Sequence, residues 1–401
     1  MNVFFTLYCR AFQAVMRVAY PFLPYRDPKI FNDVSEIADE LKRQGKRQAL
    51  IVTGKTVNSL GKTEKLKESL AHNGIGYTVF DSTVANPTVE NVNAAYSLYK
   101  SEGCDAIIGF GGGSPIDCAK AVGSIAARKN VPLQKMQGGL CVRRKTPYLI
   151  AVPTTSGTGS EVTPTSVISD SESDRKFTVN DFALIPSGAL IDPGNTVSVP
   201  PRLSATTGMD ALTHAVEAYI GWTRIKCADA DAVRAVKLVF ENLEAVYENG
   251  ENREARKNMM LASYLAGKAF SRKYVGYVHA VAHSLGGRYN VAHGFANAVL
   301  LPHVLEEYGK SAYKKLSRLA IETGVADEGD RRDVAAKKFI DAIKEMNARM
   351  NIPTFFEEIK ADDIREMARH ASKEANPLYP VPRLMDASEL EKIYYSVMQN
   401  A

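Results

Sequence analysis

The chain has 401 residues, of which 45% are hydrophobic and 24% are charged, and its formal net charge is +5. This composition is that of a globular protein, and the length favours two domains over one. The charge is small and no long block of one sign occurs, which argues against a nucleic-acid-binding protein. The five cysteines are scattered and form no CxxC pair, so we expect reduced thiols in a cytoplasmic protein.

The first 25 residues are apolar and aromatic, interrupted by Arg10 and Arg17. They are too short to span a bilayer, and no small-residue cleavage site follows them. We therefore expect an amphipathic helical extension over residues 1–28, packed on the protein body or on a second subunit. Contact of this helix with a membrane surface is the alternative.

Short apolar runs then alternate with helical patterns. The runs 48–54, 77–80, 105–110 and 148–152 have the length of buried strands. Such alternation predicts a Rossmann-like parallel sheet with ligands at the carboxyl ends of its strands. Beyond the proline-rich connection 191–201 almost every segment has a helical pattern. We therefore predict an α/β dinucleotide-binding domain over residues 29–195 and an all-helical domain over residues 196–401.

Two loops at predicted carboxyl ends of strands are rich in glycine and hydroxyl groups. In GFGGGSPID, residues 109–117, glycines would let the backbone approach a pyrophosphate. Ser114 fits a helix N-cap, Pro115 the first helical position, and Asp117 the acid of a capping box. Ser114 also stands where GxGxxG has its third glycine, so a plain strand-to-helix turn is an alternative. The second loop, PTTSGTGSEV at 153–162, would by itself equally fit a flexible connection.

The histidines are concentrated, since four of the seven lie between Gly276 and His303. His279 and His283 are four residues apart in an apolar run, so on a helix both imidazoles project from one face. The run breaks at Gly286-Gly287, and a turn there could return His293 to the first helix. These imidazoles could share one centre.

Asp210 and His214 repeat the four-residue spacing in another apolar segment. An Asp among apolar residues requires a cation or a hydrogen-bond network. Three histidines and one Asp would give a divalent metal four ligands. The alternative is that each histidine is a core or capping residue bonded to the backbone.

The amino-acid sequences of four segments closely resemble those of the iron-containing alcohol dehydrogenase family. These are GGGSPID, PTTSGTGSEVT, GMDALTHAVEAYI and GYVHAVAHSLGGRYNVAHGFANAVLLPH. The resemblance spans roughly residues 30–401 and implies a dehydroquinate synthase-like architecture. It also implies hydride transfer between NAD(P)(H) and a small primary alcohol or aldehyde. The metal that it implies is Fe²⁺, and Zn²⁺ could take the same site. Carried over residue by residue, the metal ligands are Asp210, His214, His279 and His293, and His283 matches a further active-site histidine.

The resemblance implies a set of cofactor-binding residues as well, namely Gly54, Asn86, Gly111, Gly112, Gly113, Ser114, Asp117, Thr154, Thr155, Thr158 and Lys176. NAD-linked members of the family carry an Asp directly after the strand that matches residues 48–53. In this sequence that position is Gly54. Glycine removes the charge that repels a 2′-phosphate, and Lys55 could attract one. We therefore expect NADP(H) to be favoured over NAD(H). A tight turn that accepts both cofactors is the alternative.

Residues 375–382, ANPLYPVP, depart from the CxxGNPR-like segment common in the family, which puts any substrate contact there in doubt. Glycerol dehydrogenases and dehydroquinate synthases share the architecture but have different loops. A catalytically silent relative would have no need for a buried Asp and three histidines. We therefore predict a metal-dependent alcohol dehydrogenase that forms a homodimer or higher homo-oligomer and has no membrane span.

Overall fold

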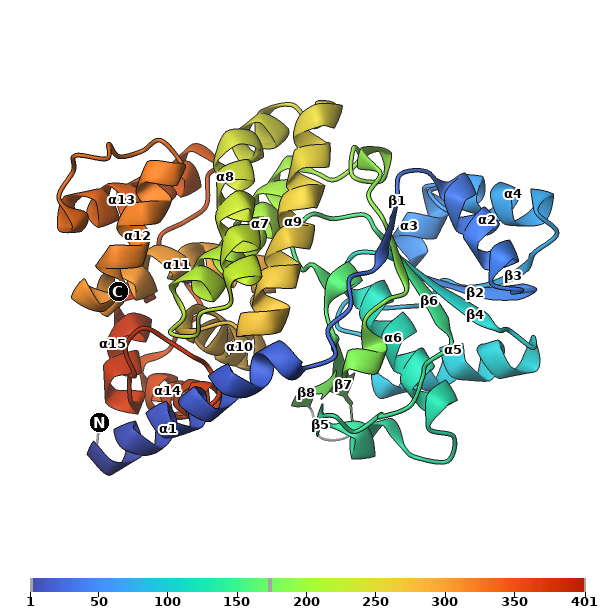
Figure 1. Ribbon diagram of the computed structural model, residues 1–401, viewed down its shortest axis with the longest axis horizontal. Helices are drawn as coiled ribbons and strands as arrows, with labels where there is room; N and C mark the ends of the chain where they lie inside the picture. The colour runs from blue at the N-terminus through green and yellow to red at the C-terminus, as the bar shows by residue number, and fades with distance from the viewer. Residues whose placement is uncertain (1–2, 172–174, 400–401) are drawn as a thin grey trace. The chain divides into compact units, whose positions relative to one another are not determined.

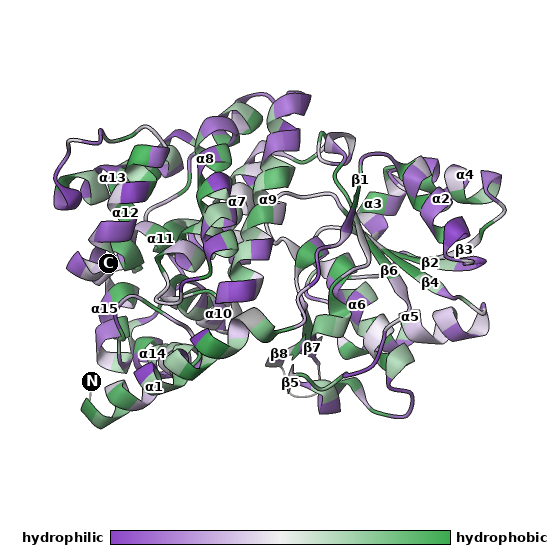
Figure 2. Ribbon diagram, in the orientation of Figure 1, coloured by the Kyte–Doolittle hydropathy of each residue, from purple (hydrophilic) through white to green (hydrophobic). Residues whose placement is uncertain are grey.

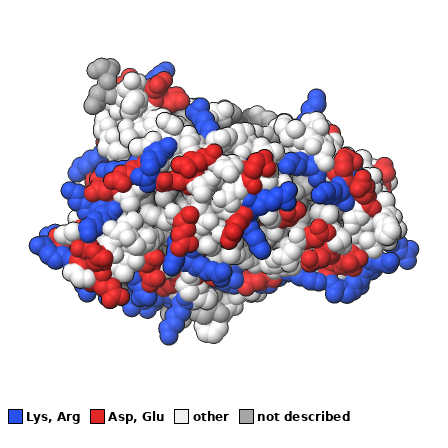
Figure 3. All heavy atoms as spheres, turned by 90° about the horizontal axis from the view of Figure 1, so that it is seen from above, with Lys and Arg blue, Asp and Glu red and all other residues white. Residues whose placement is uncertain are grey.

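The computed structural model describes residues 3–171 and 175–399, which form two compact units. One unit is Pro24–Val199, and the other joins Pro200–Ala401 with the N-terminal Met1–Leu23. The N-terminal helix thus belongs to the same compact unit as the helical part of the chain. No helix in the described part of the chain is both long and apolar enough to cross a membrane. On the face drawn in Figure 3, basic and acidic side chains are interspersed.

The Pro24–Val199 unit is built on a six-stranded sheet of order β1-β9-β6-β4-β2-β3, in which every neighbouring pair is parallel (Figure 1). A small second sheet has the order β5-β8-β7. The strands are β1 (Lys29–Phe31), β2 (Gln48–Thr53), β3 (Gly76–Phe80), β4 (Ala106–Gly111), β5 (Gly138–Gly139), β6 (Tyr148–Pro153), β7 (Thr165–Asp170), β8 (Arg175–Asn180) and β9 (Gly188–Leu190).

Helices cover both faces of the larger sheet, which is why its central strands are apolar throughout. Alternate residues of β2 enter different cores: Leu50 packs with α5 and α6, whereas Ile51 packs with α2 and α4. The helices of this unit are α2 (Val34–Arg43), α3 (Lys55–Ser59), α4 (Glu64–His72), α5 (Val89–Ser101) and α6 (Gly113–Ala127), with short 3₁₀ turns at Leu133–Met136, Ser160–Val162, Phe182–Leu184 and Pro193–Asn195.

The other unit is helical and is centred on α7, whose residues are buried along most of its length. Small residues on α7 let neighbours approach closely: a Cβ on Gly208 would lie 2.2 Å from a Leu243 methyl carbon on α8. The helices are α1 (Val3–Ala19), α7 (Pro201–Ile220), α8 (Lys226–Glu248), α9 (Arg253–Lys273), α10 (Tyr277–Tyr289), α11 (His293–Tyr308), α12 (Lys310–Glu322), α13 (Arg332–Arg349), α14 (Ala361–Ala375) and α15 (Ala387–Val397), with a 3₁₀ turn at Tyr20–Phe22.

The predicted helix break at Gly286-Gly287 is wrong. Helix α10 continues through both glycines to Tyr289, and the chain turns at Asn290, which has a left-handed conformation with φ 55°. Glycine weakens a helix without forcing it to end, and the packed apolar face of α10 carries the helix past this point. A left-handed Asn is a typical helix terminator, so Asn290 was the stronger signal.

Candidate active site

Four side chains from three helices converge on one point in the helical unit. Asp210 and His214 lie one turn apart on α7, His279 is on α10, and His293 is the first residue of α11. One donor atom from each lies within 4.8 Å of the other three. His293 Nε2 is 3.4 Å from Asp210 Oδ1, and His214 Nδ1 is 3.9 Å from the same oxygen. The first three residues are buried and His293 is half-buried, so the cluster has one accessible side.

A glycine brings His293 to this cluster. A Cβ added at Gly294 would lie 2.5 Å from the backbone oxygen of Thr206 and 3.5 Å from the Cβ of Asp210. Any larger residue would therefore push the start of α11 away from α7. The residue that follows His293 is thus a glycine because α11 and α7 meet there.

Glu217 orients His279. It is buried on α7, two turns beyond Asp210, and its carboxylate accepts hydrogen bonds from the backbone N–H groups of Gly276 and Val278. His279 Nδ1 lies 2.6 Å from Glu217 Oε2. If Nδ1 carries the proton, Nε2 keeps its lone pair and faces the cluster, as metal binding requires. Burial raises the pKa of Glu217 to about 7, and the two backbone donors oppose that rise.

Asn297 lies beside three of the four donors. Its amide nitrogen is 2.7 Å from Asp210 Oδ1, 3.2 Å from His279 Nε2 and 3.1 Å from His293 Nε2. The amide group has two N–H donors, so it can bond two of these three acceptors at once, and a ring nitrogen that it bonds carries no proton. Burial and the neighbouring histidines hold the pKa of His279 well below its ordinary value, which also favours the neutral ring. Neutral imidazoles and a carboxylate that converge in this way fit a divalent transition metal.

Two family models match most of the chain. The model "Iron-containing alcohol dehydrogenase" matches residues 30–193, and the model "Fe-containing alcohol dehydrogenase family, C-terminal" matches residues 204–398. The chain belongs to the iron-containing alcohol dehydrogenase family. It is therefore an oxidoreductase of the metal-dependent alcohol dehydrogenase and aldehyde reductase class, with an iron-type metal and a nicotinamide cofactor.

Named relatives of this family agree along nearly their whole length. The 1,3-propanediol dehydrogenase of Citrobacter freundii is 38% identical over 367 residues, which are 90% of this chain and 94% of that protein. Alcohol dehydrogenase 4 of Saccharomyces cerevisiae (strain YJM789) is 36% identical over 85% of this chain and 89% of its own. A crystal structure of 1,3-propanediol oxidoreductase superimposes with a TM-score of 0.90 at 36% identity and covers 93% of this chain and 99% of that one. These comparisons confirm the predicted fold class.

His283 lies beside the four-donor cluster of this alcohol dehydrogenase and outside it. It follows His279 by one turn of α10, and its Nδ1 is 2.7 Å from Glu374 Oε1 on α14. Its ring stacks on that of His293, with centroids 5.3 Å apart and planes 18° apart. The side chain is 44% exposed. His283 therefore combines proximity to the cluster with access to solvent.

The predicted roles of Ser114 and Asp117 at the helix start are wrong. Helix α6 begins at Gly113 with Gly112 as its N-cap, because the chain turns at Gly111, whose φ of +153° favours glycine. Ser114 is therefore inside the helix, and its Oγ accepts a hydrogen bond from the backbone N–H of Asn86. Asp117 lies too far along the helix to cap it. Its carboxylate instead accepts hydrogen bonds from Ser160 Oγ (2.6 Å) and from the backbone N–H of Val167.

The two glycine-rich and hydroxyl-rich loops lie against each other at the carboxyl edge of the sheet. The backbone N–H of Thr154 donates to Gly111 O. A Cβ at Gly112 would lie 3.4 Å from Thr155 Oγ1, and one at Gly113 would lie 3.0 Å from a Thr158 carbon. Both glycines therefore permit a close approach of the loops.

Asn86 and Lys176 extend this edge. Lys176 Nζ donates to Asn86 Oδ1 at 3.0 Å, and Asn86 has a left-handed backbone with φ 56°. Gly54 is the N-cap of α3 with φ −100°, which any residue adopts, and a Cβ there would meet Thr83 O at an ordinary 3.5 Å. The backbone at position 54 therefore does not require glycine.

A buried lysine beneath these loops was missing from the predicted set. Lys120 Nζ on α6 donates to Ser160 Oγ, to the backbone oxygens of Thr163 and Thr165, and to Thr163 Oγ1. Burial lowers the pKa of Lys120 to about 8 and raises that of Glu161 to about 7. The signal in the sequence was a lysine within the apolar run CAKAVGSIAA. Glu217 and Asn297 were missed in the same way, although each is a polar residue in an apolar helix.

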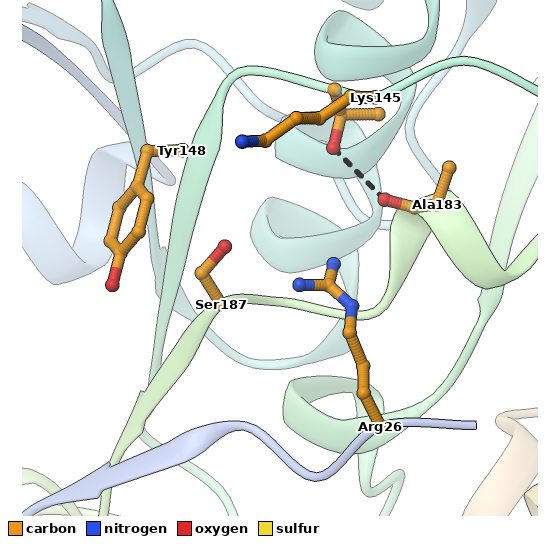
Figure 4. Close-up of a pocket in the computed structure, with 6 residues that line it drawn as sticks. Arg26, Lys145, Tyr148, Ala183 and Ser187 are labelled. Atoms are coloured by element: carbon orange, nitrogen blue, oxygen red, sulfur yellow. Dashed lines mark hydrogen bonds between the residues drawn. The ribbon is translucent and has the colours of Figure 1, made fainter. Parts of the chain in front are cut away.

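A cavity of about 210 Å³ lies at the opposite edge of the sheet (Figure 4). Its lining includes Arg26, Lys145 and Ser187, together with Tyr148, the first residue of β6. Because the strands are parallel, this edge holds their amino ends and not the glycine-rich loops. The cavity is therefore not the candidate dinucleotide site.

Proposed function

We propose that Asp210, His214, His279 and His293 hold one divalent metal, Fe²⁺ in preference to Zn²⁺. The observation that carries this proposal is the convergence of four donor atoms within 4.8 Å in a mostly buried site. A bound metal would act there as a Lewis acid toward the oxygen of an alcohol or aldehyde. A fourfold set of protein ligands also leaves coordination positions for that oxygen.

Three other side chains have distinct tasks in this proposal. Glu217 keeps the proton of His279 on Nδ1, which leaves the Nε2 lone pair for the metal, and Asn297 lies beside the ligands His279 and His293. Their contribution is orientation, because they contact the ligands and not the substrate.

His283 is proposed to move the hydroxyl proton. With its Nδ1–H directed at Glu374, its Nε2 lone pair can accept a proton, and the exposed ring can release that proton to solvent. In aldehyde reduction the same nitrogen would return a proton to the substrate oxygen. Glu374 stabilises the protonated ring through its carboxylate.

The dinucleotide is proposed to bind the glycine-rich and hydroxyl-rich loops of the α/β unit, through the residues named above. We propose NADP(H) over NAD(H). The support is that Gly54 has an ordinary φ and that a Cβ there would make only an ordinary contact with Thr83 O, so a tight turn does not explain the glycine. The missing acid then removes repulsion of a 2′-phosphate, and Lys55 follows directly.

The substrate is proposed to be a small primary alcohol or the matching aldehyde. Relatives named 1,3-propanediol dehydrogenase, NAD-dependent methanol dehydrogenase (Bacillus methanolicus) and lactaldehyde reductase (Escherichia coli strain K12) support this class. We also propose a cytoplasmic homo-oligomer, supported by free cysteines such as Cys104 and Cys118 and by the apolar outward face of α1.

The deciding experiment is metal analysis of protein loaded anaerobically with Fe²⁺, combined with absorbance at 340 nm over a panel of small aldehydes. We expect about one metal ion per chain and oxidation of NADPH with short aliphatic aldehydes. Protein that binds no Fe²⁺ or Zn²⁺ would contradict the metal proposal. Turnover with NADH and none with NADPH would contradict the cofactor proposal alone.

A further inference from the structure

The N-terminal helix α1 is an addition to the family body. The family model begins at residue 30, and the superimposed 1,3-propanediol oxidoreductase is covered over 99% of its length but covers only 93% of this chain. Nevertheless Met1–Leu23 forms part of the helical unit. Much of α1 is hydrophobic (Figure 2), and many of its large apolar side chains are exposed, whereas its two buried residues are Cys9 and the polar Gln13.

The buried polar residue of α1 is Gln13, which is 1% exposed. Its side-chain amide donates to the backbone oxygens of Pro377 (3.1 Å) and Tyr379 (2.8 Å), and its own oxygen accepts a hydrogen bond from Arg10. A glutamine is seldom buried on a helix unless its amide is fully bonded, as it is here. Gln13 is therefore placed to hold another segment of the chain.

That segment is the proline loop, which we define as residues 376–382. Arg10 bonds the same loop, since its guanidinium donates to Val381 O at 2.9 Å and to Pro382 O at 3.0 Å. We call these hydrogen bonds of Gln13 and Arg10 the clamp. Two side chains of α1 thus bond four carbonyl groups of a loop that has no regular helix or strand. A buried carbonyl without a donor destabilises the conformation that buries it. Three prolines in this loop supply no N–H of their own.

The proline loop leads to the candidate proton relay. Tyr379 Oη donates to Glu374 Oε1 at 2.8 Å, and the same oxygen lies 2.7 Å from His283 Nδ1. Tyr379 therefore joins the two ends: its backbone oxygen is bonded by Gln13 on α1, and its hydroxyl bonds the carboxylate that contacts His283 on α10.

A second contact reaches the start of α10. The Tyr20 ring, just after α1, lies 5.8 Å from the ring of Tyr274, which lies 6.3 Å from that of Tyr379. Tyr274 has φ 61° and ψ −178°, a backbone conformation that favours glycine and is strained for a residue with a side chain. Packing from both sides holds this residue three positions before α10 begins.

We propose that α1 positions His283 by clamping the proline loop. Gln13 and Arg10 are positioning residues in this view and do not touch the substrate. The inference rests on the proposed function only in assigning proton transfer to His283. The clamp itself is independent of that assignment.

Gln13→Glu tests the clamp, because it keeps the side-chain shape and removes both N–H donors. We expect amide exchange in residues 376–382 to accelerate and kcat to fall roughly 10- to 100-fold, the scale of a small misplacement of a reacting group. Metal content and the KM for the cofactor should not change. Gln13→Leu serves as a second variant in case the added carboxylate impairs folding. Gln134→Glu, the same substitution at an exposed position outside α1 and outside both candidate sites, is the matched control and should keep kcat.

A double-variant cycle separates an effect on the position of His283 from a general loss of catalytic activity. In a His283→Ala background, Gln13→Glu should cause no further loss of kcat if it acts through His283. An additive loss, or unchanged exchange of the proline loop in Gln13→Glu, would overturn the inference. If His283→Ala alone keeps the wild-type rate, the proposed role of His283 is wrong, and faster loop exchange would then still support the clamp.

Discussion

The two candidate sites of this protein are built in opposite ways. In the helical unit, Asp210, His214, His279 and His293 present side-chain atoms from three helices. In the α/β unit, the edge around Gly111 and Gly113 is formed mainly by backbone, with glycines that let two loops approach each other. A side-chain site depends on the chemical identity of each residue, whereas a backbone site depends on conformation and space. Substitutions should therefore affect the two sites by different mechanisms.

The largest effect is expected from His279→Ala. This change removes a donor atom and leaves Glu217 buried without its imidazole partner, so we expect loss of bound metal and of nearly all turnover. Dinucleotide binding should persist, because its candidate loops belong to the other unit. Elemental analysis and a fluorescence titration with NADPH measure the two properties. Stoichiometric metal at wild-type rate would remove His279 from the ligand set.

His283→Ala should separate chemistry from metal binding. We expect the metal to remain bound while kcat falls by roughly 10²- to 10⁴-fold, the range typical of a general acid–base group. Metal analysis and steady-state kinetics on the same preparation test this. Loss of the metal in this variant would place His283 among the ligands.

Gly54→Asp adds a negative charge to the candidate dinucleotide site and tests its preference for NADPH over NADH. The position accepts a Cβ without strain, so the effect should come from electrostatics and not from misfolding. We expect the KM for NADPH to rise about tenfold or more relative to that for NADH, since the carboxylate repels the 2′-phosphate and can bond a ribose hydroxyl. A wild type that already prefers NADH tenfold would contradict the premise.

Glu161→Gln should have the smallest effect on turnover, and its effect on stability should depend on pH. Burial raises the pKa of Glu161 from its ordinary 4.5 to about 7, so the folded protein binds this proton more tightly than the unfolded chain. The wild type should therefore lose stability as pH rises from about 4.5 to 7, by on the order of a few kcal/mol. Glutamine has no such titration, and the variant should gain relative to wild type across that window. Denaturant unfolding at pH 5, 6 and 7 would show this, and parallel pH dependences would contradict it.

Residue types and their spacing predicted much of this enzyme. The alternation of apolar runs and helical patterns predicted the parallel sheet, because buried strands must be apolar on both faces. The four-residue spacings predicted that Asp210 and His214, and likewise His279 and His283, share a helix face, because helix geometry is local. The wording of the four segments pointed to the family that the comparisons then showed.

Contacts between distant segments were decided only by the tertiary structure. Which imidazoles meet Asp210, and that Glu217 and Asn297 join them, depends on how α7, α10 and α11 pack. The helix that runs on to Tyr289 and the start of α6 at Gly113 likewise follow from packing and from the turn at Gly111, which override local capping preferences. The clamp of Gln13 on the proline loop joins residues more than 360 positions apart. Local patterns encode which face a residue occupies, and only the folded chain determines what that face meets.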